Sequence, residues 1–142
     1  FYIVWLQSVG VRSEQWPFAV VRLNVRAAPD KRWPQIAVSA QVPAGDRLRR
    51  GQSLFVVQCM VCHRMNGGGD AQVGPDLNLP MNPTEYFQPH ALRQLVRNPS
   101  SVRNWPTQLM PGFGPAQISD VELDDLLAYL AHMAQQRKAA PQ

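Results

Sequence analysis

The chain has 142 residues, of which 45% are hydrophobic and 17% are charged, and it contains 13 prolines and 9 glycines. This length supports one compact, loop-rich domain with some extra chain and excludes two ordinary enzyme domains. No apolar run approaches the roughly 20 residues that a membrane-spanning helix needs, so no membrane span is expected. The net charge of +4 is concentrated in residues 1–45. Because these basic residues are dispersed and form no compact basic helix, nucleic-acid binding is not expected.

Residues 1–45 differ in character from the rest of the chain. Two β-type runs are expected, at residues 1–6 and 18–25, the second with polar residues at alternate positions near its end. Residues 27–45 contain three prolines, which predicts an extended linker or wrapping arm. We therefore divide the chain into a strand-like arm at 1–45, a candidate segment for docking a partner, and a domain at 46–142.

The domain from Asp46 onward is expected to be helical. Asp46 is the predicted N-cap of a first helix that leads to Cys59. A second helix is expected at residues 89–97, because an Asn-Pro pair follows and would end it. The clearest helix begins after Ser119, since Ser119 and Glu122 have the spacing of a capping box. The segments between these helices are expected to be loops.

The two cysteines of the chain lie in one short window, where Cys59 and Cys62 are followed directly by His63. This Cys-x-x-Cys-His pattern is typical of covalent haem c attachment. Two intervening residues let one helical turn present both sulfurs to the same edge of a porphyrin, and the histidine then lies beneath the iron as its proximal ligand. A zinc site would need four ligands, and a redox-active dithiol is expected after a strand in a βαβ unit, so the sequence favours neither.

With this motif in place, residues 46–137 resemble the class I c-type cytochromes. Gly51 and Phe55 match the small and aromatic positions at which that family crosses its first helix against its last. Tyr129 occupies the corresponding place on the last helix. The resemblance implies a mainly α fold, with three to four helices around one covalent haem c, preceded here by the β-like arm.

A turn in this region also matches the family. Gly74-Pro75-Asp76-Leu77 resembles its Gly-Pro-(Asp/Asn)-Leu sequence. The resemblance implies that the Pro75 carbonyl accepts the proton on the side of the His63 ring away from the iron, which would fix the tautomer and strengthen the ligand. A simple turn with no role towards a ligand is the alternative interpretation.

Met110 is the best candidate for the second axial ligand of the iron. It lies 47 residues after His63, and Met-Pro-Gly-Phe resembles the Met-Pro-x-Phe loop of the family. A neutral thioether prefers ferrous iron, so a His/Met pair raises the reduction potential. Trp105 precedes Met110 by five residues and either donates its indole N–H to a haem propionate or fills the core. Weaker candidates for the sixth position are Met60, Met65, Met81, Met133, His90 and His132.

These features predict an electron-transfer protein and not an enzyme, because a His63/Met110 pair leaves no open iron position for a substrate. The alternative is a haem enzyme or ligand sensor whose sixth ligand is displaceable. No paired carboxylates, Ser-His-Asp set or phosphate-binding loop indicates a different chemistry.

The arm carries a second resemblance. Residues 1–5 and 14–23 resemble the closing strands of sulfite-oxidase-type molybdopterin domains. This implies that residues 1–45 dock the cytochrome onto a molybdopterin dehydrogenase subunit, or are the tail of one. Strand-like apolar runs left alone would expose edges that proteins generally cover. Since covalent haem attachment of this type takes place outside the bacterial cytoplasm, we expect a periplasmic protein.

Overall fold

The computed structural model describes residues 4, 6–7, 9, 19–104 and 106–137. Within these residues the chain consists of helices and loops, without β-strands, and none of these helices is long and apolar enough to cross a membrane. The α-helices are α1 (Pro29–Arg32), α2 (Arg47–Leu54), α3 (Pro83–Tyr86), α4 (Pro89–Arg97) and α5 (Asp120–Gln135). The mainly α prediction is confirmed, and α3, which the sequence analysis did not predict, is capped by Asn82 and Glu85.

The first helix begins where the sequence predicts. The Asp46 side chain accepts a hydrogen bond from the Leu48 N–H at 2.8 Å, which satisfies one of the donors left free at the start of α2. After Leu54 the helix widens into a π-helical turn at Phe55–Cys59. This turn carries the chain directly into the cysteine motif.

Helices α4 and α5 also confirm their predictions. Helix α4 has the predicted bounds, and Ser119 and Glu122 form the reciprocal capping box that starts α5. Arg97 on α4 lies 2.6 Å from the carboxylate of Asp120, and Arg93 pairs with Asp124. These ion pairs join α4 to the first turns of α5.

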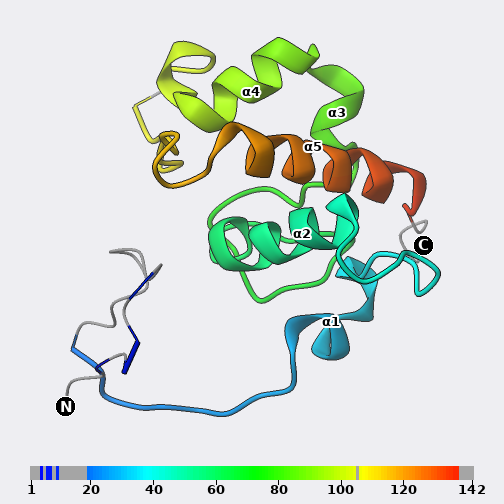
Figure 1. Cartoon of the computed structure of the whole chain (residues 1–142). Coiled ribbons are helices and arrows are strands. Elements are labelled where there is room, and N and C mark those ends of the chain that lie inside the picture. Colours follow the sequence, from blue (N-terminus) through cyan, green and yellow to red (C-terminus); the bar gives the residue numbers. More distant parts are fainter. Residues whose placement is uncertain (1–3, 5, 8, 10–18, 105, 138–142) are drawn as a thin grey trace.

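Helices α2 and α5 pack closely against each other. Figure 1 shows α5 lying between α2 on one side and α3 and α4 on the other. Gly51 makes the close approach possible, because an added Cβ would lie 2.1 Å from the backbone oxygen of Asp125. Phe55 and Tyr129 then stack at the crossing with ring centroids 5.6 Å apart. The helix crossing that the sequence resemblance implies is therefore present, and it positions the turn that ends at Cys59.

The predicted strands are wrong where the structure describes them. Residues 19–28 are irregular and extended and make no ladder with another segment, while residues 1–6 lie mostly outside the described residues. A strand is stable only when its backbone groups find partners, and the alternating pattern of 18–25 does not supply one. Figure 1 shows this extended segment leaving the helical body.

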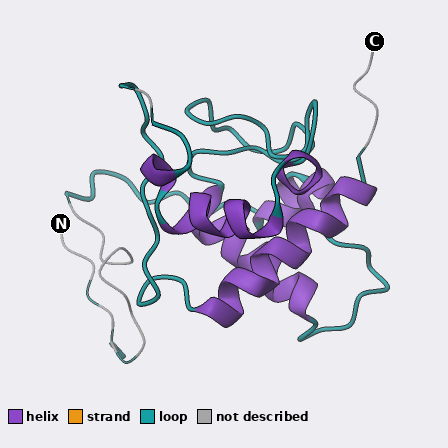
Figure 2. Ribbon diagram, turned by 90° about the horizontal axis from the view of Figure 1, so that it is seen from above, coloured by secondary structure: helices purple, strands orange, loops and turns teal. Residues whose placement is uncertain are grey.

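The predicted linker is more ordered than expected. Residues 29–36 form α1 and a 3₁₀ turn in place of an extended chain, and Ile36 and Val38 are buried in the core. The Tyr129 hydroxyl donates to the Ile36 carbonyl at 2.7 Å, and the Gln52 side chain accepts from the Val38 N–H at 2.8 Å. The division at residue 45 stays a prediction. Residues 33–38, which we call the strap, pack against the core of the helical body. Figure 2 shows the helices grouped in this body.

Candidate functional site

The cysteine motif forms one helical turn. The Cys59 carbonyl accepts from the N–H groups of Cys62 at 3.0 Å and His63 at 2.8 Å, so both sulfurs and the imidazole are presented from the same turn. Both cysteines are free thiols and half-buried. Burial of its sulfur, reinforced by the negative charge that Cys62 can carry, raises the pKa of Cys59 to about 12.

The imidazole of His63 is held on the side away from its ligand nitrogen. Its Nδ1 lies 2.8 Å from the Pro75 carbonyl oxygen, the contact that the resemblance implies. Since a carbonyl only accepts, Nδ1 carries the proton and Nε2 is the unprotonated nitrogen of the neutral ring. The ring also packs on Gly74, where an added Cβ would lie 2.5 Å from its Cε1. This arrangement leaves Nε2 as the atom that can bind a metal.

The Gly74–Pro75 turn is fixed beside the motif on both sides. The Gly74 N–H donates to the Cys62 carbonyl and the Leu77 N–H to the Arg64 carbonyl, each at 2.8 Å. The segment from Cys62 to Arg64 therefore runs beside the segment from Gly74 to Leu77, and these two hydrogen bonds flank the contact between His63 and Pro75. A simple turn would need neither bond, so the geometry favours a role for this turn towards the His63 ring.

Two buried asparagines attach the same loop to α5. Asn78 and Asn82 are fully buried, and their side-chain amides donate to the carbonyls of Met133 at 2.7 Å and Leu130 at 3.0 Å. The Asn82 amide also donates to the Asn78 side chain at 2.8 Å. Sequence reasoning missed both residues, because only the fold brings their amides to carbonyls near the end of α5.

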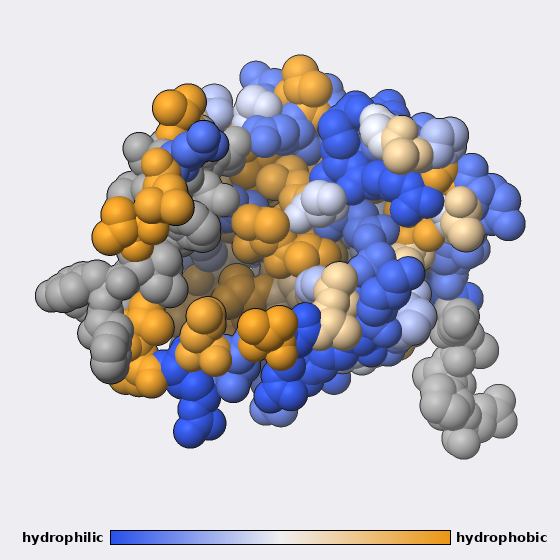
Figure 3. All heavy atoms as spheres, turned by 60° about the horizontal axis from the view of Figure 1, so that its bottom comes forward, coloured by the Kyte–Doolittle hydropathy of each residue, from blue (hydrophilic) through white to orange (hydrophobic). Residues whose placement is uncertain are grey.

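The residues of the motif fit a covalent haem and not a zinc ion. Among the described residues, no three His, Cys, Asp or Glu side chains come together as a metal-ion site. Two unpaired thiols and one imidazole with a free Nε2 are instead the donor set that two thioether bonds and one axial bond require. Figure 3 shows a face on which hydrophobic side chains surround a hollow.

The loop that carries Met110 is anchored to α4. The Phe113 N–H donates to the Val96 carbonyl at 2.9 Å, and Arg97 donates back to the Phe113 carbonyl at 2.9 Å. An added Cβ at Gly112 would lie 2.5 Å from the Arg97 carbonyl oxygen, so this loop approaches the helix closely. Met110 itself is half-buried just before this anchor. Its role as sixth ligand stays a prediction.

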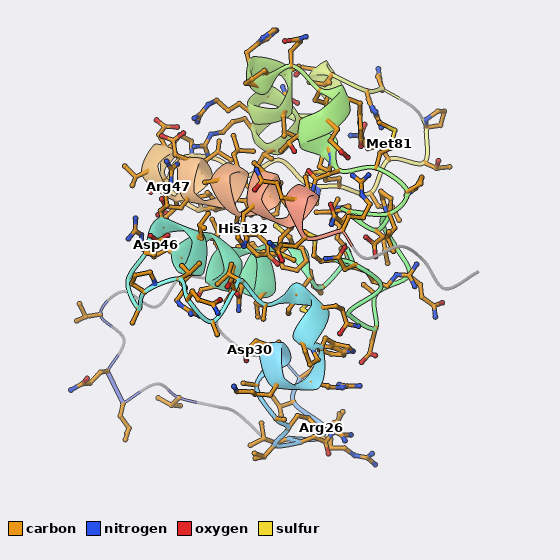
Figure 4. The ribbon with its side chains drawn as sticks, turned by 90° about the vertical axis from the view of Figure 1, so that its right-hand side faces the viewer. Arg26, Asp30, Asp46, Arg47, Met81 and His132 are labelled. Carbon is orange, nitrogen blue, oxygen red and sulfur yellow. The ribbon has the colours of Figure 1, made fainter. Side chains whose placement is uncertain are left out.

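The other candidate ligands lie in different settings. Met65 and Met133 are buried in the core, which agrees with packing roles. Met81 is half-exposed in the loop before α3, and Figure 4 shows it away from His132 on α5. Within the described part of the chain the buried Nε2 of His132 has no hydrogen-bond partner. Trp105 lies outside the described residues, so both of its interpretations stay open.

Comparison with known proteins gives the family. The family model described as Cytochrome c matches residues 48–134, which is more than half of the chain. This stretch extends from the start of α2 almost to the end of α5 and contains Cys59, Cys62 and His63. No solved structure matches the chain at a significant level. With the attachment motif and the held imidazole in place, the chain belongs to the cytochrome c family and carries covalently bound haem c.

Proposed function

We propose that this cytochrome passes single electrons as the electron-accepting subunit or domain of a periplasmic dehydrogenase, with a molybdenum-dependent enzyme as the class that its arm resembles. Haem-based electron transfer follows from the family. The observation that carries the proposal furthest is the held imidazole, with Nδ1 of His63 2.8 Å from the Pro75 carbonyl. A fixed ligand suits a carrier, because little has to move when the charge on the iron changes.

Haem c, when bound, supplies one-electron iron chemistry and no atom transfer. The contribution of the chain is to hold two ligands for the haem iron and to exclude other ligands from it. His63 presents Nε2 because its other nitrogen is occupied by Pro75. Met110 would supply the thioether ligand, from a loop that Pro111 stiffens and Phe113 ties to α4.

Replacing Met110 with alanine separates the carrier from the alternative of a haem enzyme or ligand sensor. The wild-type holoprotein should show a six-coordinate, low-spin His/Met spectrum and react slowly with carbon monoxide at neutral pH. Met110→Ala should lose that spectrum and bind carbon monoxide rapidly. The matched control is Met81→Ala, which removes a half-exposed methionine and should leave the spectrum unchanged. Rapid reaction of the wild-type protein would instead favour the sensor or enzyme.

The partner is proposed to bind the extended segment at residues 19–28. Its apolar side chains alternate with polar ones and are almost fully exposed, at 96% for Val21, 77% for Leu23 and 93% for Val25. Exposed apolar residues in an extended segment are a ready strand for addition to the edge of another sheet. Arg22 alternates with them and is also exposed, so the same segment is basic.

The base of this segment lies beside the haem attachment turn. Pro29 and Trp33 line a shallow hollow together with Met60 and Val61, the two residues between the cysteines. Figure 4 shows Asp30 in α1 and Arg26 in the segment that leads to it. A dehydrogenase bound to residues 19–28 would therefore lie near the edge of the haem that the cysteines hold, which supports electron entry there.

Deletion of residues 1–28 tests the docking role more cleanly than deletion of residues 1–43. The shorter deletion leaves Ile36 and Val38 in the core, whereas the longer one removes them. In the native host, the variant lacking residues 1–28 should keep the wild-type haem spectrum but elute from size exclusion without the molybdenum that accompanies the wild-type chain. A changed spectrum would make the segment part of the haem fold, and unchanged co-elution would exclude docking through it.

A further inference from the structure

The side chain of Asp76 collects a set of backbone hydrogen bonds beside the proximal histidine. Four N–H groups donate to its carboxylate, those of Asn66 at 3.2 Å, Gly67 at 2.7 Å, Asn78 at 2.8 Å and Leu79 at 3.0 Å. We propose that Asp76 is a positioning residue for His63. Its carboxylate holds the turn that follows His63 and the segment that follows Asp76, and it thereby aims the Pro75 carbonyl at Nδ1 of the imidazole. The inference rests on the proposed ligation of iron by His63.

The loop that follows His63 is shaped to receive a carboxylate. Asn66 and Gly67 have positive φ values of 53° and 76°. Met65 and Gly68 exchange backbone hydrogen bonds at 3.0 and 2.8 Å, which closes the turn. Successive N–H groups in such a turn point to one side and form an anion-binding concavity. Asp76 supplies the anion, so its side chain joins this turn to the Pro75 segment.

The position of Asp76 in the chain links its carboxylate to the Pro75 carbonyl. The peptide group between Pro75 and Asp76 is planar, so the direction of the carbonyl is set by the backbone angles on either side. The proline ring fixes only φ of Pro75, so ψ of Pro75 and φ of Asp76 set this direction. On the second side, the carboxylate and the Leu77 N–H, which donates to the Arg64 carbonyl at 2.8 Å, hold the residues that follow. Without the carboxylate, only the backbone hydrogen bonds of Gly74 and Leu77 hold this turn, so the Pro75 carbonyl is held less firmly at the ring.

Positioning and charge have separable effects on the haem. The bond from Nδ1 to Pro75 increases the electron donation of Nε2, so its weakening raises the reduction potential. Removal of a negative charge near the iron also raises the potential. Asp76→Asn removes the charge but keeps an oxygen for the donors of Asn66, Asn78 and Leu79. Asp76→Ala removes both the charge and the acceptor, so the two variants share the loss of charge and of the Gly67 hydrogen bond and differ in the three hydrogen bonds that asparagine keeps.

The test compares holoproteins by nuclear magnetic resonance and redox titration. Exchange of the His63 Nδ1 proton with solvent should be roughly tenfold faster in Asp76→Ala, the factor for about one lost hydrogen bond. It should stay near the wild-type rate in Asp76→Asn. The reduction potential should rise further in Asp76→Ala than in Asp76→Asn. The charge control is Asp70→Asn, which neutralises an exposed carboxylate paired with Arg32 at 2.8 Å.

Equal exchange rates and equal potentials in Asp76→Ala and Asp76→Asn would overturn the proposal, because charge alone would then explain Asp76. If Asp76→Ala yields no holoprotein, Asp76→Ser takes its place, and exchange should be faster in Asp76→Ser than in the wild type and in Asp76→Asn. Equal exchange rates in Asp76→Ser and Asp76→Asn would also overturn the proposal. If His63 does not bind the iron, the spectrum of the wild-type protein already shows no sign of a histidine ligand. That outcome is distinguishable from a failure of the proposal about Asp76.

Discussion

Replacing Gly51 with alanine should destabilise the holoprotein by about 3 kcal/mol. The new Cβ would lie 2.1 Å from the Asp125 backbone oxygen and 2.7 Å from the Tyr129 Cβ, whereas ordinary contact begins at 3.4 Å. Because backbone cannot rotate away, α2 and α5 must separate by about 1 Å. Such overpacking costs about 3 kcal/mol at the upper end of its range. Disturbing the stack of Phe55 on Tyr129 adds about 1 kcal/mol, and the better helix propensity of alanine offsets about as much.

Urea unfolding of the holoproteins, followed by circular dichroism, measures this difference. The matched control is Gly114→Ala, because no atom lies within 4 Å of an added Cβ there and its backbone is not left-handed. The control should unfold within about 0.5 kcal/mol of the wild type. If Gly51→Ala is as stable as Gly114→Ala, α2 and α5 do not cross at Gly51 and the reasoning is refuted.

Three further substitutions test other parts of the account. Gly74→Ala should displace the proximal imidazole, since the new Cβ would lie 2.5 Å from the ring, and raise the potential in a redox titration; an unchanged potential would contradict this packing. Tyr129→Phe leaves the buried Ile36 carbonyl without its donor and should cost about 1–2 kcal/mol in urea unfolding, with no loss meaning that the strap is not docked. The pKa of Glu85 is lowered, first by the Asn82 N–H, so its stabilisation is present near neutral pH and lost as the pH falls through that lowered pKa. Glu85→Gln should therefore be less stable than wild type at pH 7 and equal to it in strong acid, and a pH-independent difference would contradict the contact.

Helix starts could be predicted because their signals are local. The side chains of Asp46, Ser119 and Glu122 bond to backbone groups two or three residues away, so the sequence contains both partners. Helix α3 carried the same kind of signal, since Asn82 and Glu85 have capping-box spacing around a proline, and could have been predicted on the same grounds.

Features that depend on distant partners could not be predicted in this way. The alternation at residues 18–25 indicated a strand, but a strand needs a neighbour, and residues 19–28 have none within the described chain. Ile36 lies between prolines typical of linkers, yet its side chain is buried in the core and its carbonyl accepts from Tyr129, 93 residues later. The contacts of Asp76 likewise form only when the turn after His63 folds back onto it.

The candidate site was predictable to the extent that its chemistry lies in one short motif. Cys59, Cys62 and His63 are close in sequence, so one helical turn had to bring them together. Pro75 was identified by family resemblance, and its carbonyl lies at the expected nitrogen of the ring. The position of Met110 across the haem depends on a loop 47 residues away and stays a prediction.

The haem content and redox titration of the purified wild-type holoprotein decide whether this chain is an electron carrier with covalent haem. We expect one haem per chain that stays attached to Cys59 and Cys62 after denaturation and acid extraction, seen as a mass increase of one haem. We also expect one reversible one-electron step with a low-spin spectrum in both oxidation states. Haem that is extracted from the denatured chain would contradict covalent attachment. A high-spin iron that binds added ligands at once would contradict the role of this chain as an electron carrier.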